Sequence, residues 1–416
     1  MKFIQAIFAA RWQKTLYISF FAQLMTAVGF SSIFPFLPLY VQELGAVSGL
    51  SIELLAGLVF SGQAFTMMLA APFWGAMADR YGRKLMVERA LFGGAVILLL
   101  MAFARSAEEL VILRALQGLI TGTVAAVNAL VAAQAPREHA GYAMGLLTVS
   151  LGAGVALGPL IGGVIADVFS YSATFYITGA LLFLAGIIVH IGIQETFVRP
   201  EMNPGKKNSF MGGWWSIFSA RGIAVAYSMR FAGQLAGNLI LPIAPLFIQS
   251  LMTDTTTLNT TTGVVVGVSA ATTTASAVYM GRLGDRIGHR SIIIFCSLAA
   301  GLFYVIQWGV TAPWQLLALQ ALVGVAVGGI GPSISALLAK YCYPGQEGTV
   351  FGLDNSITSG ARSVAPMIGA AFAYALSLRT AFLAAAGLYM LLALVASRYF
   401  PAEAGLSPAS DNPAIE

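Results

Sequence analysis

Charged side chains inside apolar segments are the residues of this chain best suited to chemistry in a low-dielectric environment. Arg114, Arg230 and Arg362 each lie within a long apolar run. A charge at the centre of a bilayer costs roughly 2.5–3.5 kcal/mol on insertion scales, so we expect each arginine to face a wet cavity or a partner. Asp354 is the acid that we place inside such a run. The predicted chemistry is therefore proton exchange at a carboxyl group near fixed positive charge.

Polar residues extend these charged positions along their helices. Arg230, Gln234 and Asn238 follow one another at intervals of four residues, which puts them on one helix face. Asp354 and Arg362 end a second stripe of the same spacing, which covers about 12 Å at 1.5 Å per residue. We predict that both stripes face a polar space between helices.

Membrane-spanning helices must position these charges. The sequence is 58% hydrophobic and 9% charged, with a mean hydropathy of +0.82, whereas about 25% charged residues would be usual for a soluble protein. Apolar runs long enough to cross about 30 Å of hydrocarbon predict twelve spans. These runs fall near residues 15–41, 54–77, 85–104, 110–133, 140–166, 173–193, 222–249, 262–280, 291–310, 315–339, 349–375 and 380–399.

The basic residues predict the orientation of these spans. Of the 22 Lys and Arg residues, 17 fall on one side, whereas the opposite loops hold only Arg105 and Arg379. The positive-inside rule then puts both termini in the cytoplasm. We predict a multi-pass protein of the cell membrane (inner or plasma membrane). Because the basic residues are scattered over short loops, no surface for binding nucleic acid is predicted.

A polar cluster between apolar runs occurs twice in the sequence. The segment 75–84 reads GAMADRYGRK, and the segment 281–290 reads GRLGDRIGHR. Asp79 and Asp285 are 206 residues apart (285 − 79), which is about half of the chain. A duplicated polar hinge in an apolar chain indicates two similar halves. The residues that we expect to form gating hinges are Gly75, Asp79, Arg80, Gly82, Arg83, Asp285 and Arg286.

The repeat extends well beyond the hinges. PFLPLYVQ at 35–42 returns as PIAPLFIQ at 242–249. We therefore predict an all-α integral membrane protein with twelve transmembrane helices in two pseudo-symmetric six-helix bundles, related by an axis along the membrane normal. The predicted segments are a first bundle over 1–193, a cytoplasmic linker over 194–218, a second bundle over 219–403 and a disordered cytoplasmic tail over 404–416.

The repeat preserves none of the three intramembrane arginines. Their counterparts are neutral, namely Gln320 for Arg114, Gln23 for Arg230 and Val155 for Arg362. A structural role demanded by the fold would be expected in both halves, so this asymmetry favours a functional role. We predict that Asp354, Arg114 and Arg362 take part in proton coupling. The alternatives for Asp354 are a simple partner for Arg362 or a part of the cytoplasmic gate.

Three motifs carry a resemblance to a known family. They are Gly75-x3-Asp79-Arg80-x-Gly82-Arg83-Lys84 between spans 2 and 3, Arg114-Ala-Leu-Gln117-Gly118 in span 4, and Gly154-x3-Gly158-Pro159-x2-Gly162-Gly163 in span 5. With them the chain resembles the major facilitator superfamily, and within it the twelve-span drug:H⁺ antiporter group of bacterial multidrug exporters, over nearly its whole length. The first motif is diagnostic of the superfamily, and the third is the narrower indication of export.

The resemblance also implies where the site lies. In the resembled family, spans 1, 4, 7 and 10 line a central cavity. The implied cavity residues are Gln23, Phe34, Arg114, Gln117, Arg230, Gln234, Asn238 and Gln320. The resemblance further implies that Asp79 faces the start of span 11, and that the span-5 motif seals the two bundles against leakage. The alternative for the motif glycines is ordinary close packing of helices.

The function implied by the resemblance is export by alternating access, in which protons move against a small amphipathic, drug-like compound. The alternatives are an H⁺ symporter or facilitator, or an exporter of an anionic or zwitterionic metabolite such as a lipid-like molecule, a sugar derivative or a metal chelator. The sequence contains no Gly-x4-Gly-Lys-Ser/Thr motif, so it does not support ATP-driven pumping. We expect no enzymatic activity, cofactor or metal site. The expected partners of this monomer are a small molecule, protons and the lipid bilayer.

Overall fold

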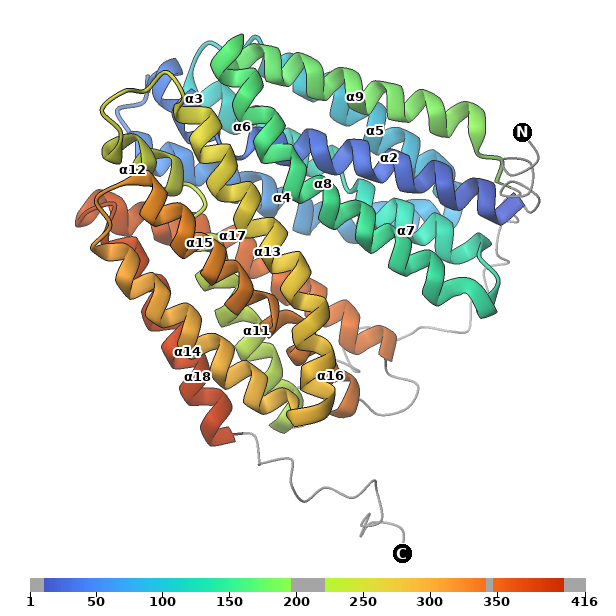
Figure 1. Ribbon diagram of the computed structural model, residues 1–416. Helices are drawn as coiled ribbons and strands as arrows, with labels where there is room; N and C mark the ends of the chain where they lie inside the picture. Colours follow the sequence, from blue (N-terminus) through green and yellow to red (C-terminus); the bar gives the residue numbers. More distant parts are fainter. Residues whose placement is uncertain (1–10, 196–220, 342–346, 400–416) are drawn as a thin grey trace, which may run out of the picture.

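The computed structural model describes residues 11–195, 221–341 and 347–399. Regular structure within these ranges is entirely helical (Figure 1), which confirms the all-α prediction. The tail 404–416, and all but the first two residues of the predicted linker, lie outside the described residues.

Each half of the chain supplies six predicted spans. The first half forms α2 (Arg11–Ile33), α3 (Leu37–Leu44), α4 (Ile52–Tyr81), α5 (Arg83–Met101), α6 (Ala107–Ile120), α7 (Thr123–Gln134), the 3-10 turn η1 (Arg137–His139), α8 (Ala140–Val168) and α9 (Tyr171–Gly192). The second half forms α11 (Arg221–Leu239), α12 (Ala244–Leu251), α13 (Leu258–Ile287), α14 (His289–Trp308), α15 (Pro313–Gly328), α16 (Ile330–Tyr341), α17 (Glu347–Ala375) and α18 (Thr380–Tyr399).

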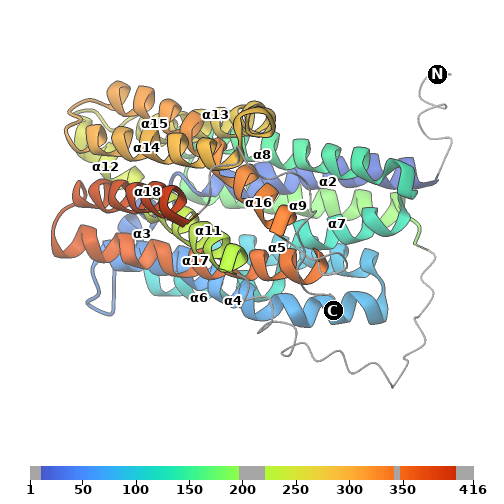
Figure 2. The same cartoon turned by 90° about the horizontal axis from the view of Figure 1, so that it is seen from below.

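Two spans differ from the others in their charge. Ten helical units in the described ranges are long and apolar enough to cross a membrane. The helices α5 and α17 are not among these ten, because charged residues make them less apolar. Four of the first seven residues of α5 are charged, and α17 contains Asp354 and Arg362. Both run alongside the apolar helices of their bundles (Figures 1 and 2). Together these helices make the twelve predicted spans.

Four spans are broken into two helices, and they are the four that the resemblance assigns to a central cavity. Pro35 lies in the break between α2 and α3, and Pro242 lies in the break between α11 and α12. Proline lacks a backbone N–H, so each residue interrupts the backbone hydrogen bonds of its helix. The α6–α7 break lies at Gly122, which has a φ of 124°. Glycine adopts this angle without strain, whereas other residues would be strained. The α15–α16 break lies at Gly329. The breaks therefore occur at equivalent places in the two halves.

Packing follows the repeat in the same way. In the first bundle α2 contacts α8, α4 contacts α6, and α5 contacts α9; the equivalent contacts in the second bundle join α11 to α17, α13 to α15, and α14 to α18. Each bundle encloses its own hydrophobic core. A few side chains cross over: Leu39 of α3 and Tyr171 of α9 pack against the core of the second bundle, and Leu241 packs against the core of the first.

The two bundles meet along two equivalent helix pairs, α4 with α17 and α8 with α13 (Figure 2). A Cβ atom on Gly57 of α4 would lie 2.8 Å from the Cβ atom of Ala370 and 3.1 Å from the Pro366 carbonyl oxygen of α17. The equivalent Gly263 of α13 packs against the Pro159 carbonyl oxygen of α8. In both contacts a glycine packs against a proline carbonyl oxygen. The two equivalent interfaces therefore share the same atomic contact.

On α8 and α13, these contacts extend from one end of the molecule to about the middle of the helices. We call the end that holds Gly82 and Gly288 the hinge end, and the end that holds α3 and α12 the far end. The bundles pack together toward the far end and diverge toward the hinge end, where α2 begins and α18 ends (Figure 1). On α8, Gly152 packs against Thr274 of α13, whereas a Cβ atom added to Gly145 would have no neighbouring atom within 4 Å. The far end is therefore closed between the bundles.

Candidate functional site

An ion pair inside the second bundle joins three helices. Arg230 of α11 donates from Nε to Oδ1 of Asp354 on α17 at 2.8 Å. Its Nη1 donates to the Gly331 carbonyl of α16 at 3.2 Å, and its Nη2 donates to the Ser335 hydroxyl at 2.5 Å. The side chains of Arg230 and Asp354 are only 8% and 14% exposed. The pair thus places a carboxylate and its counter-charge in a shielded position two turns inside α17.

The partner of Asp354 is not Arg362, which the sequence left open as an alternative. Asp354 bonds to Arg230, and among the described residues neither Arg114 nor Arg362 forms an ion pair. Arg362 is eight residues from Asp354 on the same helix, or about 12 Å along its axis, which is too far for contact. Arg230 reaches Asp354 because α11 packs directly against α17.

Arg114 is held by neutral groups alone. Its Nη1 donates to Gln117 Oε1 at 2.6 Å, its Nη2 to Gln63 Oε1 at 2.7 Å, and its Nε to the Val59 carbonyl at 3.3 Å. The residue is 1% exposed. Acceptors on α4 and α6 therefore satisfy the guanidinium group, but its positive charge has no carboxylate partner among the described residues.

The ion pair has a neutral equivalent in the first bundle. Gln23 and Leu147 stand 207 residues before Arg230 and Asp354, respectively. The Gln23 side chain donates to the Leu147 carbonyl at 3.1 Å, between α2 and α8. The same helix contact is thus made by an amide in one bundle and by an ion pair in the other.

The Arg114 site has a neutral equivalent in the second bundle. Gln320 replaces the arginine, and Ser269 stands 206 residues after Gln63. The Ser269 hydroxyl donates to Gln320 Oε1 at 3.5 Å, and Gln320 Nε2 donates to Gln307 at 3.4 Å. Each bundle therefore holds one charged site and one neutral site, at exchanged positions.

Arg362 lies close to the junction between the bundles. It precedes Pro366, which contacts Gly57 of α4, by one turn of α17 on the side toward the hinge end. Its side chain is exposed and forms no hydrogen bond or ion pair within the described part of the chain. Arg362 thus presents an uncompensated positive charge at the place where α4 and α17 begin to separate.

The remaining predicted cavity residues surround these charges in part. Phe34 packs on Phe60 with ring centroids 5.9 Å apart, and the Arg114 guanidinium carbon lies 5.9 Å from the Phe60 centroid. Asn238 donates to the Gln234 carbonyl at 2.7 Å on the same face of α11. The polar stripe of α11 thus continues the line of Arg230 toward the far end.

The first hinge contains a contact from the linker. The backbone N–H groups of Arg83 and Lys84, at the start of α5, donate to the two carboxylate oxygens of Glu195 at 3.1 and 2.8 Å. The Arg80 guanidinium lies 5.3 Å from the ring of Tyr81. The Asp79 side chain lies outside the described residues, so its predicted position opposite span 11 stays a prediction.

The second hinge is held differently. Asp285 pairs with His289 at 3.3 Å, where the first hinge has Asp79 and Arg83. Arg290 donates to the carbonyl oxygens of Ala396 and Ser397 at the end of α18. This hinge is therefore anchored to its own bundle.

The span-5 glycines form two faces of α8. A Cβ atom on any of Gly154, Gly158 and Gly162 would collide with α2 of the same bundle, whereas Gly163 packs against the Asn259 and Thr260 backbone of α13. The predicted seal between bundles is thus made by an adjoining face that includes Gly163 and the Pro159 carbonyl. The reason is the helical repeat, because three residues spaced by four share a face that Gly163 leaves by about 100°.

A carboxylate bridges the bundles at the far end. Asp167, near the end of α8, accepts hydrogen bonds from the Asn259 backbone and side-chain nitrogens at 3.1 and 2.8 Å, and from the Thr260 N–H at 2.7 Å. These donors belong to the first turn of α13, which has no side-chain cap of its own. Asp167 therefore caps the N-terminus of a helix in the opposite bundle, where the helix dipole favours a negative charge.

Sequence reasoning missed the roles of four residues. Gln63 and Ser335 bind the arginines, Glu195 caps α5, and Asp167 bridges the bundles. The sequence could have indicated Gln63 as a site residue, because Gln63 and its repeat counterpart Ser269 are both polar residues within apolar spans. The described residues contain no group of three or more His, Cys, Asp or Glu side chains that could hold a metal ion.

Comparisons with known proteins agree with this architecture. A family model described as Major Facilitator Superfamily matches residues 19–251 and 226–413. Multidrug resistance protein MdtG of Salmonella typhimurium is 32% identical over 386 residues, which cover 92% of this chain and 94% of the relative. The protein of the same name from Rahnella sp. is 34% identical over 373 residues, covering 89% and 90% of the two chains. The chain belongs to the major facilitator superfamily and is a membrane transporter, not an enzyme.

Solved structures show the same fold. The nucleoside transporter NupG superimposes with a TM-score of 0.77 at 14% identity, over 94% of this chain and 100% of that chain. A D-xylose–proton symporter gives a TM-score of 0.75 at 14% identity, over 94% and 99%. At these identities the likeness concerns the fold alone. The predicted family and fold are confirmed.

Proposed function

We propose that this transporter is a secondary active exporter, which works by alternating access and couples the exit of a small amphipathic, drug-like compound to the entry of protons. The relatives named multidrug resistance protein support export of such compounds. The observation that carries the proton coupling is the shielded Asp354–Arg230 pair. It holds a carboxylate inside a span, where binding a proton changes the local charge in a low-dielectric setting.

Protonation of Asp354 would act on the arrangement of helices. The ionised carboxylate accepts from Arg230 and ties α17 to α11. A neutral carboxyl group would lose the ion pair while Arg230 keeps its bonds to α16. Because α17 also contacts α4 across the bundles, the protonation state of Asp354 can bias the seal between them.

The proposed orientation places the hinge end in the cytoplasm of the cell, with the protein in the inner or plasma membrane. The excess of Lys and Arg at that end supports this assignment under the positive-inside rule. With the far end closed, the structure then corresponds to the inward-open state of the cycle. Cargo would enter between the diverging bundles from the cytoplasm.

The test is the internal pH of proteoliposomes that contain the full chain, read with a trapped dye while lipophilic cations and anionic metabolites are added one at a time. Substrate-evoked proton movement opposite to the cargo is expected for the wild type and should be lost in Asp354→Asn. Asp254→Asn is the matched control. Asp254 lies in an exposed loop, where the Thr256 backbone N–H holds the pKa of its carboxyl group below the usual value.

Each result of this assay bears on one part of the proposal. Cargo movement without proton movement in the wild type would indicate a facilitator, and protons moving with the cargo would indicate a symporter. Antiport that survives in Asp354→Asn would remove Asp354 from the coupling mechanism and leave the exporter assignment intact.

A second candidate cargo is an anionic or zwitterionic metabolite. The specific observation is the charge balance, since Asp354 is paired with Arg230 while Arg114 and Arg362 lack carboxylate partners among the described residues. Arg362 is also exposed near the inter-bundle contact. An uncompensated positive charge favours an anionic group and disfavours a lipophilic cation.

The substitution Arg362→Gln separates the two cargo classes. Because Arg362 has no partner to lose among the described residues, we expect the variant to keep the wild-type unfolding temperature. For an anionic cargo, its KM should rise by about tenfold, which corresponds to one lost charge contact of about 1.4 kcal/mol. For a lipophilic cation, KM should stay the same or fall. An unchanged KM for every anionic compound transported would exclude Arg362 from the cargo site.

A further inference from the structure

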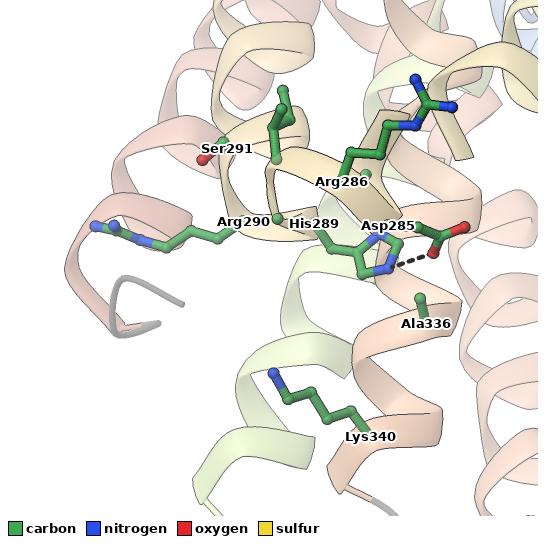
Figure 3. A pocket seen from close by; sticks show the side chains of 10 residues that line it. Asp285, Arg286, His289, Arg290, Ser291, Ala336 and Lys340 are labelled. Atoms are coloured by element: carbon green, nitrogen blue, oxygen red, sulfur yellow. Dashed lines mark ion pairs between the residues drawn. The ribbon is translucent and has the colours of Figure 1, made fainter. Parts of the chain in front are cut away.

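A basic pocket lies at the hinge end of the second bundle, where α13 meets α14 and α16 (Figure 3). Its volume is about 690 Å³. The basic side chains in its lining come from all three helices, namely Arg286, His289, Arg290 and Lys340. Its acid, Asp285, is paired with His289 at 3.3 Å (Figure 3). The Arg290 guanidinium points away toward the end of α18, where it donates to the Ala396 and Ser397 carbonyl oxygens (Figure 3). The lining still carries more basic than acidic side chains, and the transport mechanism proposed above makes no use of it.

The start of α14 adds backbone donors to this pocket. The helix begins after Gly288, whose φ is 92°, and no side chain caps it. The first N–H groups of a helix have no acceptor within the helix, and the helix dipole makes this end attractive to anions. His289, Arg290 and Ser291 form this first turn and line the pocket.

The repeat supplies an independent observation, because an oxyanion is bound at the equivalent position of the first bundle. Gly82 stands 206 residues before Gly288, has a φ of 102°, and precedes α5 in the same way. There the N–H groups of the first two residues donate to both carboxylate oxygens of Glu195. Among the described residues no carboxylate bonds the equivalent N–H groups of α14. One copy of this site is thus filled by an oxyanion, while the other opens into a basic cavity.

The surroundings favour a lipid as the source of the anion. Phe295 lies one turn after Ser291 on α14 and is 68% exposed, and Leu298 and Leu302 continue the line at 51% and 54% exposure. In a membrane-spanning helix this apolar line faces acyl chains. A headgroup in the pocket would therefore have its chains next to an apolar surface, as in basic sites between helices that bind anionic headgroups.

We propose that this pocket binds the phosphate group of an anionic phospholipid. The α14 N-terminal N–H groups and Lys340 are the donors to the phosphate oxygens. A phosphate bound here links α14 to α16, and it occupies in the second bundle the role that Glu195 has in the first.

The experiment is native mass spectrometry of the delipidated full chain in detergent, titrated with phosphatidylglycerol, zwitterionic phosphatidylcholine or inorganic phosphate. We expect one saturable phosphatidylglycerol site and no saturable phosphatidylcholine site. Lys340→Gln should weaken phosphatidylglycerol binding about fivefold, as expected for one basic residue beside an anionic headgroup. Arg398→Gln removes a charge from the same end of the same bundle without touching the pocket, and it should change binding by less than about twofold.

Two further variants test the argument from the repeat. Glu195→Gln removes the carboxylate that occupies the N-terminal N–H groups of α5. This variant should allow a second phosphatidylglycerol to bind, in the first bundle. Glu403 follows α18 in the sequence as Glu195 follows α9, so we test its carboxylate as a competitor for the pocket. If lipid binds to Glu403→Gln but not to the wild type, the chain itself fills the pocket and the proposal is wrong.

Other outcomes also decide against a lipid. Equal weakening by Lys340→Gln and Arg398→Gln would show that only general surface charge attracts the lipid. Saturable binding of inorganic phosphate without phosphatidylglycerol binding would keep an anion site but reject a phospholipid as its ligand. Size-exclusion profiles and unfolding temperatures equal to those of the wild type show that each variant is folded.

Discussion

The Arg230–Asp354 pair is the residue-scale feature with the sharpest consequences. Removal of one partner of a shielded ion pair leaves an uncompensated charge and costs roughly 3–5 kcal/mol, whereas replacement of both partners by well-packed neutral groups is often nearly neutral. The first bundle already contains such a replacement, because Gln23 and Leu147 occupy the equivalent positions. The frame of the fold therefore does not require the ion pair.

A pair of substitutions tests this separation of stability from coupling. Arg230→Gln alone should lower the unfolding temperature in detergent clearly, because it leaves Asp354 without its partner. The double variant Arg230→Gln/Asp354→Leu copies the first bundle and should recover most of that loss. It should nevertheless show no substrate-evoked proton movement. A double variant less stable than Arg230→Gln would contradict the equivalence of the two sites.

The sequence allowed the intramembrane charges to be found but not their partners. Arg114, Arg230, Arg362 and Asp354 stand out because charge is costly inside apolar runs. Which of them meet depends on the rotation and packing of helices far apart in the chain, and 124 residues separate Arg230 from Asp354. Spacing alone therefore suggested Arg362, on the same helix, as an alternative partner for Asp354, and the described residues contain no such ion pair.

At the scale of helices, the two equivalent contacts between the bundles depend on glycine. Gly263 of α13 lies directly against the Pro159 carbonyl of α8, so an added methyl group meets backbone and not a movable side chain. Overpacking of this kind typically costs about 1–3 kcal/mol. The cost applies only while the bundles are closed at the far end, so it acts on the conformational equilibrium.

Gly263→Ala should therefore shift the molecule toward a state open at the far end. Spin labels at Val47→Cys and Asp254→Cys, which lie in far-end loops of the two bundles, should show a larger population of long distances. Gly281→Ala is the control on the same helix, where the nearest atom to a new Cβ is 3.9 Å away. It should leave the distances unchanged and should be neutral or slightly stabilising. Equal distance distributions in both variants would contradict the tight contact.

The elements themselves were largely predictable. Hydropathy, the charge asymmetry of loops and the duplicated hinge predicted the spans and the two halves, because a bilayer strongly restricts what an apolar chain can do. The breaks in spans 1, 4, 7 and 10 were not predicted, although Pro35 and Pro242 mark two of them. The face of α8 that seals the bundles was also missed, since glycine spacing shows which residues share a face but not which helix they meet.

At the scale of the whole molecule, the proposed alternating access requires the bundles to close at one end when they open at the other. The far end is closed by the glycine contacts and by Asp167, which caps α13 across the bundles with three hydrogen bonds. No equivalent cross-bundle hydrogen bond is formed at the hinge end by the described residues. The closed far end is thus held by contacts that the opposite state must lose.

Asp167→Asn tests this exchange, because the amide loses the charge that the α13 N-terminus attracts and turns a donor toward the Thr260 N–H. Hydrogen bonds to a charged group contribute about 1.5–3 kcal/mol each when shielded and less where water competes, so we expect the closed population to fall about tenfold. Distances between labels at Val47→Cys and Asp254→Cys should lengthen. Those between hinge-end labels at Tyr142→Cys and Ile287→Cys should shorten in the same sample. Glu43→Gln removes an exposed acid from the same end and should change neither distance. If Asp167→Asn lengthens the far-end distance without shortening the hinge-end distance, the bundles loosen independently and do not rock as rigid units.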